Sequence, residues 1–237
     1  NQKLKTGQTV GSQIVTIERS KTRCRVRNQM RGKFITIEGT EGVGKTTNIK
    51  FIQDWMDSKK LTYGCTREPG GTPLAEQVRE LLLAPREESV CNTAELLMVF
   101  AARAQHLNQV IEPMLGEGAW VLCDRFTDAT YAYQGAGRHM RDDLIRDLEL
   151  MVQGSLQPDL TLILDIPVQI GLARASERST PDRFEQEQVA FFERVRNRYL
   201  QIAQDNPQRC VVIDASLTLE GVQAQITQTL ETFWETV

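Results

Sequence analysis

Short apolar runs alternate with longer amphipathic stretches along most of this chain. Five short runs rich in apolar and β-branched residues are strand candidates, at 33–38, 61–68, 119–124, 160–165 and 210–214. Between them the sequence predicts helices, several with apolar residues at spacings of three and four, near 46–60, 73–83, 93–115, 139–153, 185–204 and 219–234. This alternation predicts an α/β fold, with a doubly wound five-stranded parallel sheet and helices on both faces.

Candidate functional residues fall where the predicted strands end. A glycine-rich loop follows residue 38, and Arg67, Asp124 and Asp165 each lie at the end of another apolar run. Ligands of open parallel sheets bind outside the carboxyl ends of the strands. We therefore expect these residues to lie at one edge of the sheet and to form a ligand site.

The segment GTEGVGKT (39–46) matches the phosphate-loop pattern G-x-x-x-x-G-K-[ST] between a predicted strand and a predicted helix. Its glycines permit close backbone approach, and its amides can form an anion-binding concavity at a helix N-terminus. Lys45 is expected to reach the β- and γ-phosphates of ATP, and the Thr46 hydroxyl to hold Mg²⁺. The predicted ATP-binding residues are Gly39, Thr40, Glu41, Gly42, Val43, Gly44, Lys45 and Thr46. The alternative is a glycine-rich turn that only joins strand to helix.

This loop indicates a nucleoside triphosphate but not a reaction. GTPase switches share it and read guanine with an N-K-x-D motif, which is absent from the sequence. Motor and partitioning ATPases share it too. The rest of the chain has to identify the acceptor.

Composition narrows the class of protein. The five cysteines include no C-x-x-C pair and the two histidines belong to no metal-binding pattern, which argues against a zinc module, a disulfide framework or a histidine metal site. No apolar run approaches the roughly 20 residues of a membrane helix. The net charge is −3, and the body of the chain lacks the basic balance of a general nucleic-acid binder. We expect a cytoplasmic protein with no membrane or nucleic-acid partner.

Residues 1–29 differ from the rest of the chain. They hold seven basic side chains against Glu18 alone and show no clear apolar period. We expect a flexible basic N-terminal extension, with residues 30–237 forming the folded domain. The alternatives are a basic tail that contacts an acidic partner and an arginine-rich targeting peptide.

Five segments carry a resemblance to a known family: FITIEGTEGVGKTT (34–47), TREPGGTPLAEQVRELLL (66–83), ELLMVFAARAQH (95–106), CDRFTDATYAYQGAGR (123–138) and DRFEQE (182–187). In this order and spacing they resemble bacterial thymidylate kinase, a P-loop nucleoside-monophosphate kinase family. The resemblance implies transfer of the γ-phosphoryl group of ATP to dTMP, giving dTDP and ADP for dTTP synthesis. It also implies Mg²⁺ as cofactor and a homodimer, for which we expect helix 93–115 to supply a contact face.

The resemblance also assigns roles around the acceptor. Arg67 is implied to grip the monophosphate, and Arg103, next to Phe100 on one helix, to hydrogen-bond the thymine ring. Asp124 and Arg125 are implied at the reaction centre, with Asp124 as the Mg²⁺-organising carboxylate and Asp165 as its rival. The remaining implied substrate residues are Thr130 at the base, Tyr133 over the deoxyribose, Gln134 beside them, and Glu41 near the 3′-hydroxyl.

Three departures from the family pattern affect these expectations. Val99 occupies the usual position of a stacking phenylalanine, so Phe100 is either a substrate contact or part of the core. Ala129 replaces a common serine. Gly42 follows Glu41 where some relatives carry a catalytic arginine, so a cation has to come from elsewhere.

The arginine-bearing stretch 174–183 is the expected source of that cation. We predict a lid over ATP in which Arg178 and Arg183 are catalytic, with Arg174 at its start. The alternative is that these arginines form ordinary ion pairs with Glu177, Glu185 and Glu187. Two other functions stay open at this stage: a kinase for a different nucleoside monophosphate and a P-loop ATPase switch.

Overall fold

The computed structural model describes residues 31–176, 182–185 and 187–237. The predicted basic extension, and Arg178 within the predicted lid, therefore lie outside the described residues. The five strands are β1 (Phe34–Glu38), β2 (Tyr63–Arg67), β3 (Trp120–Asp124), β4 (Leu160–Asp165) and β5 (Cys210–Asp214). They form one parallel sheet in the order β2-β3-β1-β4-β5, as the apolar runs predicted.

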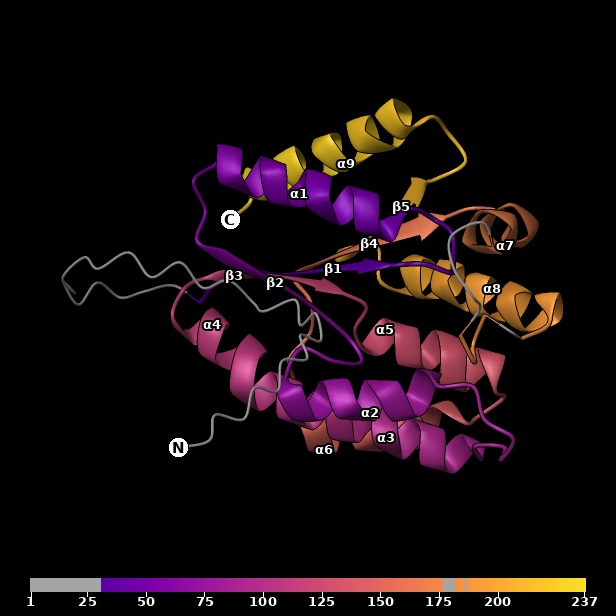
Figure 1. The fold of residues 1–237 in the computed structure, drawn as a ribbon. Helices are drawn as coiled ribbons and strands as arrows, with labels where there is room; N and C mark the ends of the chain where they lie inside the picture. The colour runs from indigo at the N-terminus through magenta and orange to yellow at the C-terminus, as the bar shows by residue number, and fades with distance from the viewer. Residues whose placement is uncertain (1–30, 177–181, 186) are drawn as a thin grey trace, which may run out of the picture.

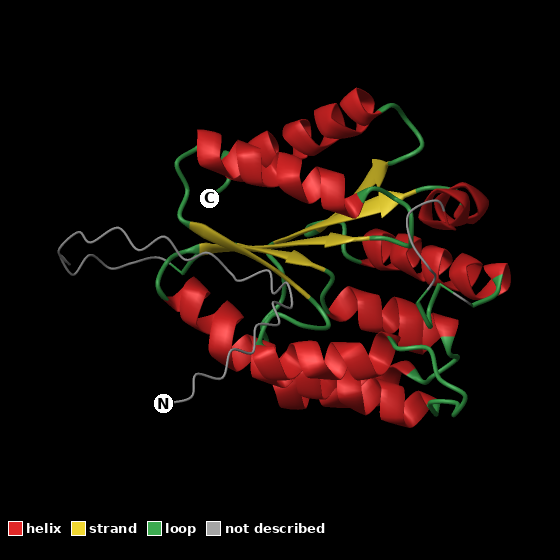
Figure 2. Cartoon of the chain, in the orientation of Figure 1, coloured by secondary structure: helices red, strands yellow, loops and turns green. Residues whose placement is uncertain are grey.

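Helices cover both faces of this sheet (Figure 1). On one face lie α1 (Lys45–Ser58) and α9 (Leu219–Trp234), and their apolar side chains share a core with the sheet. On the other face lie α2 (Pro73–Leu83), α3 (Asn92–His106), α4 (Glu112–Gly116), α5 (Thr127–Thr130), α6 (Asp142–Gln153) and α8 (Val189–Asp205). Figure 2 shows this layering by element type. The doubly wound prediction is confirmed.

Two helices contain a π-helical turn. Leu107–Ile111 joins α3 to α4, so the predicted helix 93–115 is one continuous rod with a wider turn inside it. Tyr131–Gly137 likewise extends α5. Single π-helical turns are rare and often occur at functional sites. The short helix α7 (Val168–Ser176) follows β4, and the sequence pattern had not separated it from the polar stretch after it.

The three tryptophans pack together at the amino ends of the strands. Trp234 contacts Trp55 and Trp120, with ring centroids 6.4 and 5.7 Å away. Glu231 adds polar contacts, accepting a 2.8 Å hydrogen bond from the Trp55 indole and a 2.7 Å ion pair from Lys59. This tryptophan cluster joins α1, β3 and α9 at the end of the sheet opposite the phosphate loop.

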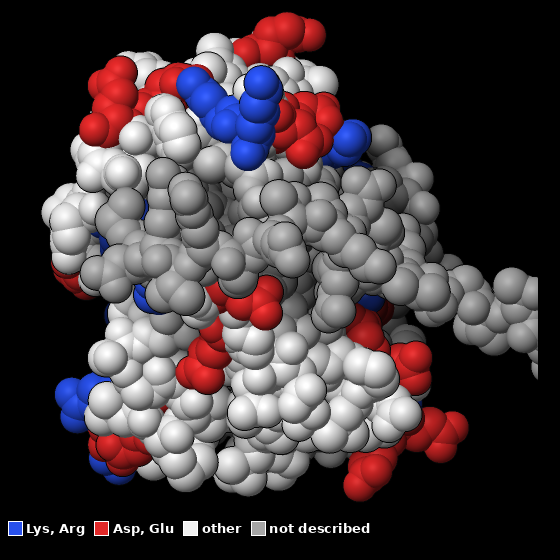
Figure 3. Space-filling view, turned by 90° about the vertical axis from the view of Figure 1, so that its left-hand side faces the viewer, with Lys and Arg blue, Asp and Glu red and all other residues white. Residues whose placement is uncertain are grey.

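Figure 3 shows the face at this end of the molecule. Basic and acidic side chains are interspersed there, with wide uncharged areas between them. Within the described ranges, no helix combines the length and the apolarity needed to cross a lipid bilayer.

Candidate active site

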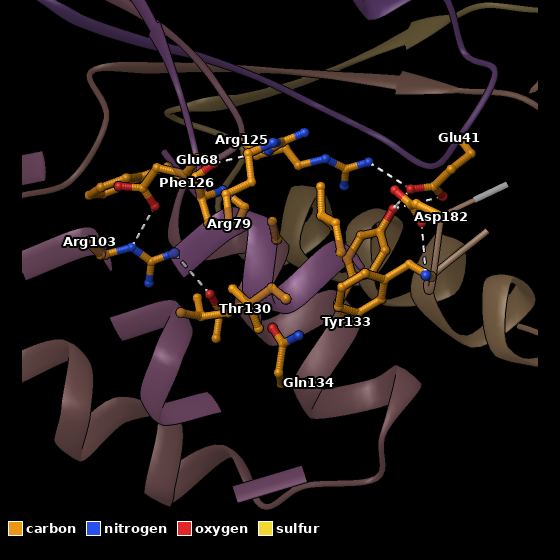
Figure 4. Close-up of a pocket in the computed structure, with 16 residues that line it drawn as sticks. Glu41, Glu68, Arg79, Arg103, Arg125, Phe126, Thr130, Tyr133, Gln134 and Asp182 are labelled. Atoms are coloured by element: carbon orange, nitrogen blue, oxygen red, sulfur yellow. Dashed lines mark hydrogen bonds and ion pairs between the residues drawn. The ribbon is translucent and has the colours of Figure 1, made fainter. Parts of the chain in front are cut away.

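A cavity opens at the carboxyl ends of β1, β2 and β3, below the phosphate loop (Figure 4). Residues from the loop, α2, α3, α5, the π-helical turn and the segment 182–184 share its wall. They are Glu41, Glu68, Pro69, Arg79, Leu82, Leu83, Val99, Arg103, Arg125, Phe126, Ala129, Thr130, Tyr133, Gln134, Asp182 and Phe184. Most predicted acceptor residues are therefore brought together.

The phosphate loop has the backbone geometry that its glycines predicted. Gly39, Gly42 and Gly44 have φ values of 136°, 73° and 87°, which side chains rarely tolerate. Lys45 begins α1, and its Nζ lies 3.4 Å from the carbonyl oxygens of Gly39 and Thr40, folded back along the loop. Burial and the nearby Arg125 guanidinium lower the pKa of Lys45, so an incoming phosphate would restore charge balance there.

Close packing against α7 explains why Gly42 carries no side chain. A Cβ at Gly42 would lie 1.9 Å from the carbonyl oxygen of Gly171, and one at Gly171 would lie 2.5 Å from that of Glu41. The two backbones therefore touch. An arginine at position 42 cannot fit this arrangement, which makes the family departure noted above a structural requirement of this chain.

Glu41 and Arg125 link the phosphate loop to the cavity. Arg125 Nη2 donates a 3.0 Å hydrogen bond to Glu41 Oε1. Its guanidinium carbon lies 4.7 Å from the Tyr133 ring centroid, and the Tyr133 hydroxyl donates to both Glu41 oxygens at 2.8 and 2.9 Å. Figure 4 shows these three side chains converging from separate elements. Arg125 adopts φ 69°, a left-handed conformation unusual for arginine.

The backbone at Arg125 is held by Glu38, which sequence reasoning missed. Glu38 is fully buried at the end of β1; its Oε1 accepts from the Phe126 amide at 2.7 Å and its Oε2 from the Tyr199 hydroxyl at 2.8 Å. Burial, with the Asp128 carboxylate nearby, raises the pKa of Glu38 to about 8. An acidic residue at the end of an apolar strand, directly before the glycine-rich loop, was the feature of the sequence that could have indicated Glu38.

The two rival carboxylates have different surroundings. Asp165 accepts two hydrogen bonds from Arg196, at 2.7 and 2.9 Å, so its charge is already neutralised. Asp124 pairs in the sheet with Ile37 of β1 and Arg67 of β2, and its buried Oδ1 has no hydrogen-bond partner among the described residues. A buried, unpartnered carboxylate oxygen beside the phosphate loop fits a cation or a metal-bound water.

Arg79 lines the cavity, whereas the predicted phosphate ligand Arg67 is not in its wall but lies close enough to act on the charge of Arg79. Arg67 is exposed and donates to Glu76 at 2.8 Å, while Arg79 donates to the Pro69 carbonyl at 3.0 Å. Burial and the neighbouring Arg67 guanidinium lower the pKa of Arg79, so an anion bound between them would be favoured. Sequence reasoning missed Arg79, although it lies in the apolar stripe of α2 with Ala75 and Leu82, where a charged residue is unexpected.

Arg103 is 2% exposed and held from several sides. Its Nε donates to Glu68 at 2.7 Å and its Nη2 to Thr130 at 2.9 Å, whereas its buried Nη1 has no partner in the part of the chain that the structure describes. His106 lies 3.1 Å from the other Glu68 oxygen. Burial alone would raise the pKa of Glu68, but Arg103 and His106 hold it below its usual value. One guanidinium nitrogen is thus available to a ligand.

Phe100 belongs to the core and does not line the cavity, which corrects its assignment as a substrate contact. It packs with Leu96 and Ile145, and its ring centroid lies 4.8 Å from the Arg103 guanidinium carbon. Consecutive helical residues point about 100° apart, so Val99 faces the cavity and Phe100 does not. The aromatic rings in the wall are Phe126, Tyr133 and Phe184.

The predicted lid arginines have other contacts within the described residues. Arg174 Nη1 donates to the Ala215 carbonyl at 3.5 Å. Arg183 donates from Nε to the Leu82 carbonyl at 2.7 Å, and its Nη2 lies 2.7 Å from Glu95 Oε2. Arg183 is therefore tied to the acceptor side of the site and not to the phosphate loop. Among the residues that the structure describes, its ion-pair partner is Glu95, and neither Glu185 nor Glu187 pairs with it.

Comparisons with known proteins agree with this geometry. A family model described as thymidylate kinase matches residues 37–226. Thymidylate kinase of Teredinibacter turnerae is 60% identical over 204 residues, which cover 86% of this chain and 100% of the relative. Thymidylate kinase of Pseudomonas putida strain GB-1 is 60% identical over 197 residues, covering 83% of this chain and 94% of the relative. The crystal structure of thymidylate kinase from Ehrlichia chaffeensis superposes with a TM-score of 0.67 at 34% identity, covering 85% of this chain and 99% of that one.

Proposed function

The chain belongs to the thymidylate kinase family, and from this premise we propose that it transfers the γ-phosphoryl group of ATP to dTMP, giving ADP and dTDP. One observation carries the proposal beyond family membership. Arg125 reaches from the acceptor cavity to Glu41 of the phosphate loop, so the donor and acceptor sites adjoin through a single ion pair. A switch ATPase would have no use for a second cavity built in this way.

Positioning and charge neutralisation supply most of the catalysis in such a transfer. The loop amides and Lys45 bind the β- and γ-phosphates. Arg125, with Arg79 and the neighbouring Arg67, binds the acceptor monophosphate and offsets the charge of the two phosphates that meet. Glu41 and Tyr133 hold the sugar, with the Glu41 carboxylate accepting from the 3′-hydroxyl.

Deeper in the cavity, Arg103, Thr130 and Gln134 contact the base. The unpartnered Arg103 Nη1 suits a thymine carbonyl oxygen, because a guanidinium presents donors in a fixed plane. Phe126 and Phe184 are the rings available for contact with the base face. No residue is required to become covalently modified.

Mg²⁺ fits the residues present. The Thr46 hydroxyl on the first turn of α1 and the Asp124 carboxylate would hold the ion or its waters, with ATP phosphates completing the set. Among the described residues no cluster of three or more His, Cys, Asp and Glu side chains forms a ready-made metal site, as suits an ion that arrives with its nucleotide. An ion held there would supply positive charge to offset that of the phosphates.

The missing loop cation is assigned to the stretch 174–183. Gly42 cannot carry an arginine, and Arg183 is engaged by Glu95. Arg178 is then the residue of this stretch that we expect to meet the γ-phosphate. A cation supplied in this manner is worth roughly 10³–10⁵ in rate in other phosphoryl-transfer systems.

We assign the protein to the cytoplasm, where dTMP and ATP occur and where free thiols such as those of Cys65 and Cys123 persist.

A homodimer is also part of the proposal. Its contact face comprises α2, α3 and α6, on which six large apolar side chains are exposed: Leu74, Leu81, Leu97, Leu144, Leu150 and Met151. Exposed apolar groups on neighbouring helices favour a protein contact.

An acceptor comparison tests the proposed reaction. ADP release is measured by a coupled assay with dTMP, dUMP, dCMP, AMP or no acceptor. We expect an absolute requirement for an acceptor and the fastest turnover with dTMP. Lys45→Ala serves as the blank, with a loss of about 100-fold or more. Acceptor-independent ATP turnover would favour a switch ATPase, and faster turnover with another monophosphate would reassign the substrate.

A further inference from the structure

Glu95, in the first turn of α3, is a fully buried carboxylate that the proposed phosphate chemistry does not use. Its Oε1 accepts a 2.8 Å hydrogen bond from Nε2 of Gln134. Gln134 comes from the π-helical turn after α5 and lines the cavity beside Thr130 (Figure 4). Glu95 itself is not in the cavity wall, so it acts on a substrate through the residues that it holds, and Gln134 is the one of its hydrogen-bond donors that lines the cavity.

Two arginines neutralise the Glu95 charge. Arg138 Nε lies 3.3 Å from Oε1, and Arg183 Nη2 lies 2.7 Å from Oε2. Both guanidinium groups are themselves mostly buried, with side chains 14% and 15% exposed. A carboxylate between two guanidinium groups can only accept hydrogen bonds.

This restriction fixes the orientation of the Gln134 amide. A glutamine amide has a donating NH₂ end and an accepting oxygen end, which packing alone distinguishes poorly. Because Glu95 only accepts, the NH₂ end has to face Glu95, and the carbonyl oxygen is left for the cavity. The same cavity wall therefore offers a hydrogen-bond acceptor from Gln134 and the donor Nη1 of Arg103.

The pyrimidine bases differ in the hydrogen-bond donors and acceptors that they present at N3 and at position 4. Thymine and uracil present an N3–H donor beside the O4 acceptor, whereas cytosine presents an N3 acceptor beside an N4 amino donor. Resting on the proposed function, we propose that Glu95 is a specificity-positioning residue: it holds the Gln134 carbonyl oxygen toward the base and thereby selects N3–H pyrimidines over cytosine.

Glu95→Gln tests this directly. The new side chain has the same size but can donate as well as accept, so the Gln134 amide can take either orientation. We expect the preference for dTMP over dCMP to fall by about tenfold, whether measured as kcat/KM or as the dCMP inhibition constant. The preference for dTMP over dUMP should not change, since these bases share the same edge. A merely structural role would not separate these two ratios.

Two further variants complete the test. Glu149→Gln is the matched control: Glu149 is also buried and accepts from glutamine amides of Gln153 and Gln157, but it lies outside this cavity. It should leave both ratios unchanged. Glu95→Asp keeps an obligate acceptor and should retain the dTMP-over-dCMP preference even if turnover falls.

The outcomes separate this inference from the proposed function. A wild-type enzyme that does not phosphorylate dTMP overturns the proposed function. A wild-type enzyme that does so, paired with an unchanged dTMP-to-dCMP ratio in Glu95→Gln, overturns the role of Glu95 alone. If Glu95→Gln does not fold, loss of the ratio in a folded Glu95→Asp variant has the same meaning, and its retention supports the proposal.

Discussion

The hydrogen-bond and ion-pair partners of a side chain indicate whether it is free to bind a ligand. Asp124 and Asp165 both end a strand, and no periodicity distinguishes them. Asp165 is paired twice with Arg196, whereas an Asp124 oxygen is buried without a partner among the described residues. The difference lies entirely in neighbours distant along the chain, so sequence reasoning could separate these two carboxylates only by family resemblance.

Asparagine substitutions check this assignment. Asp124→Asn should lower kcat by about 100-fold, because it removes charge from the proposed Mg²⁺ site. Asp165→Asn should keep most turnover and lose about 1 kcal/mol of stability with its half-buried ion pair. Steady-state rates across a Mg²⁺ titration and urea unfolding measure both. Equal loss of turnover in the two variants contradicts the assignment.

Glu38 makes stability depend on pH. With a pKa of about 8 in the fold and about 4.5 unfolded, the native state holds one more proton between those values. The free energy of unfolding should therefore fall as pH rises from about 4.5 to about 8, by at most roughly 1.4 kcal/mol per pH unit. Glu38→Gln should flatten this slope in urea titrations at several pH values. An unchanged slope in the variant would show that another group is responsible.

The phosphate loop was predicted from its own motif, and Arg103, Arg125 and Tyr133 from the family resemblance. The structure brings these residues to one cavity or its edge, and their roles stay predictions. Sequence reasoning missed Arg79, Glu68, Glu38 and Glu95, each of which acts on a residue at least ten positions away. Long-range partners leave no local pattern, so only coordinates reveal them.

The observed strands and helices follow the pattern of apolar residues closely. The predicted strand 160–165 coincides with β4, and the predicted helix 219–234 with α9. The π-helical turn at Tyr131–Gly137 was not predictable, because hydrophobic periodicity does not register a wider turn over seven residues. Yet this turn presents Tyr133 and Gln134 to the cavity together with Thr130 of α5.

The contact between the phosphate loop and α7 can be tested with alanine. Gly42→Ala adds a methyl group 1.9 Å from the Gly171 carbonyl at a φ of 73°. Gly154→Ala is the control, since Gly154 also has a positive φ, 58°, but open space around its Cβ. Backbone strain should cost about 1–3 kcal/mol in both. Only Gly42→Ala should lose further stability and raise the KM for ATP. Equal stability and KM values in the two variants would mean that the loop and α7 separate readily.

At the scale of the whole molecule, the apolar face of α2, α3 and α6 predicts self-association. Leu97→Glu should shift the protein from dimer to monomer in sedimentation, because it places a charge in the proposed contact. Leu217→Glu is the matched control: this leucine is 48% exposed and lies two residues before α9, a helix on the opposite face of the sheet. A monomeric wild type, or a dimer that persists in Leu97→Glu, would rule out this face.

The position of the tryptophan cluster determines what intrinsic fluorescence can measure in this protein. All three indoles lie at the end of the sheet remote from the cavity, and Trp55 and Trp120 are less than 9% exposed. Intrinsic emission should therefore track global denaturation faithfully and stay nearly silent when dTMP or ATP is added. A titration that shows no fluorescence change would be no sign of weak binding. A Phe184→Trp substitution would place an indole in the cavity wall, where its fluorescence should change when a ligand binds.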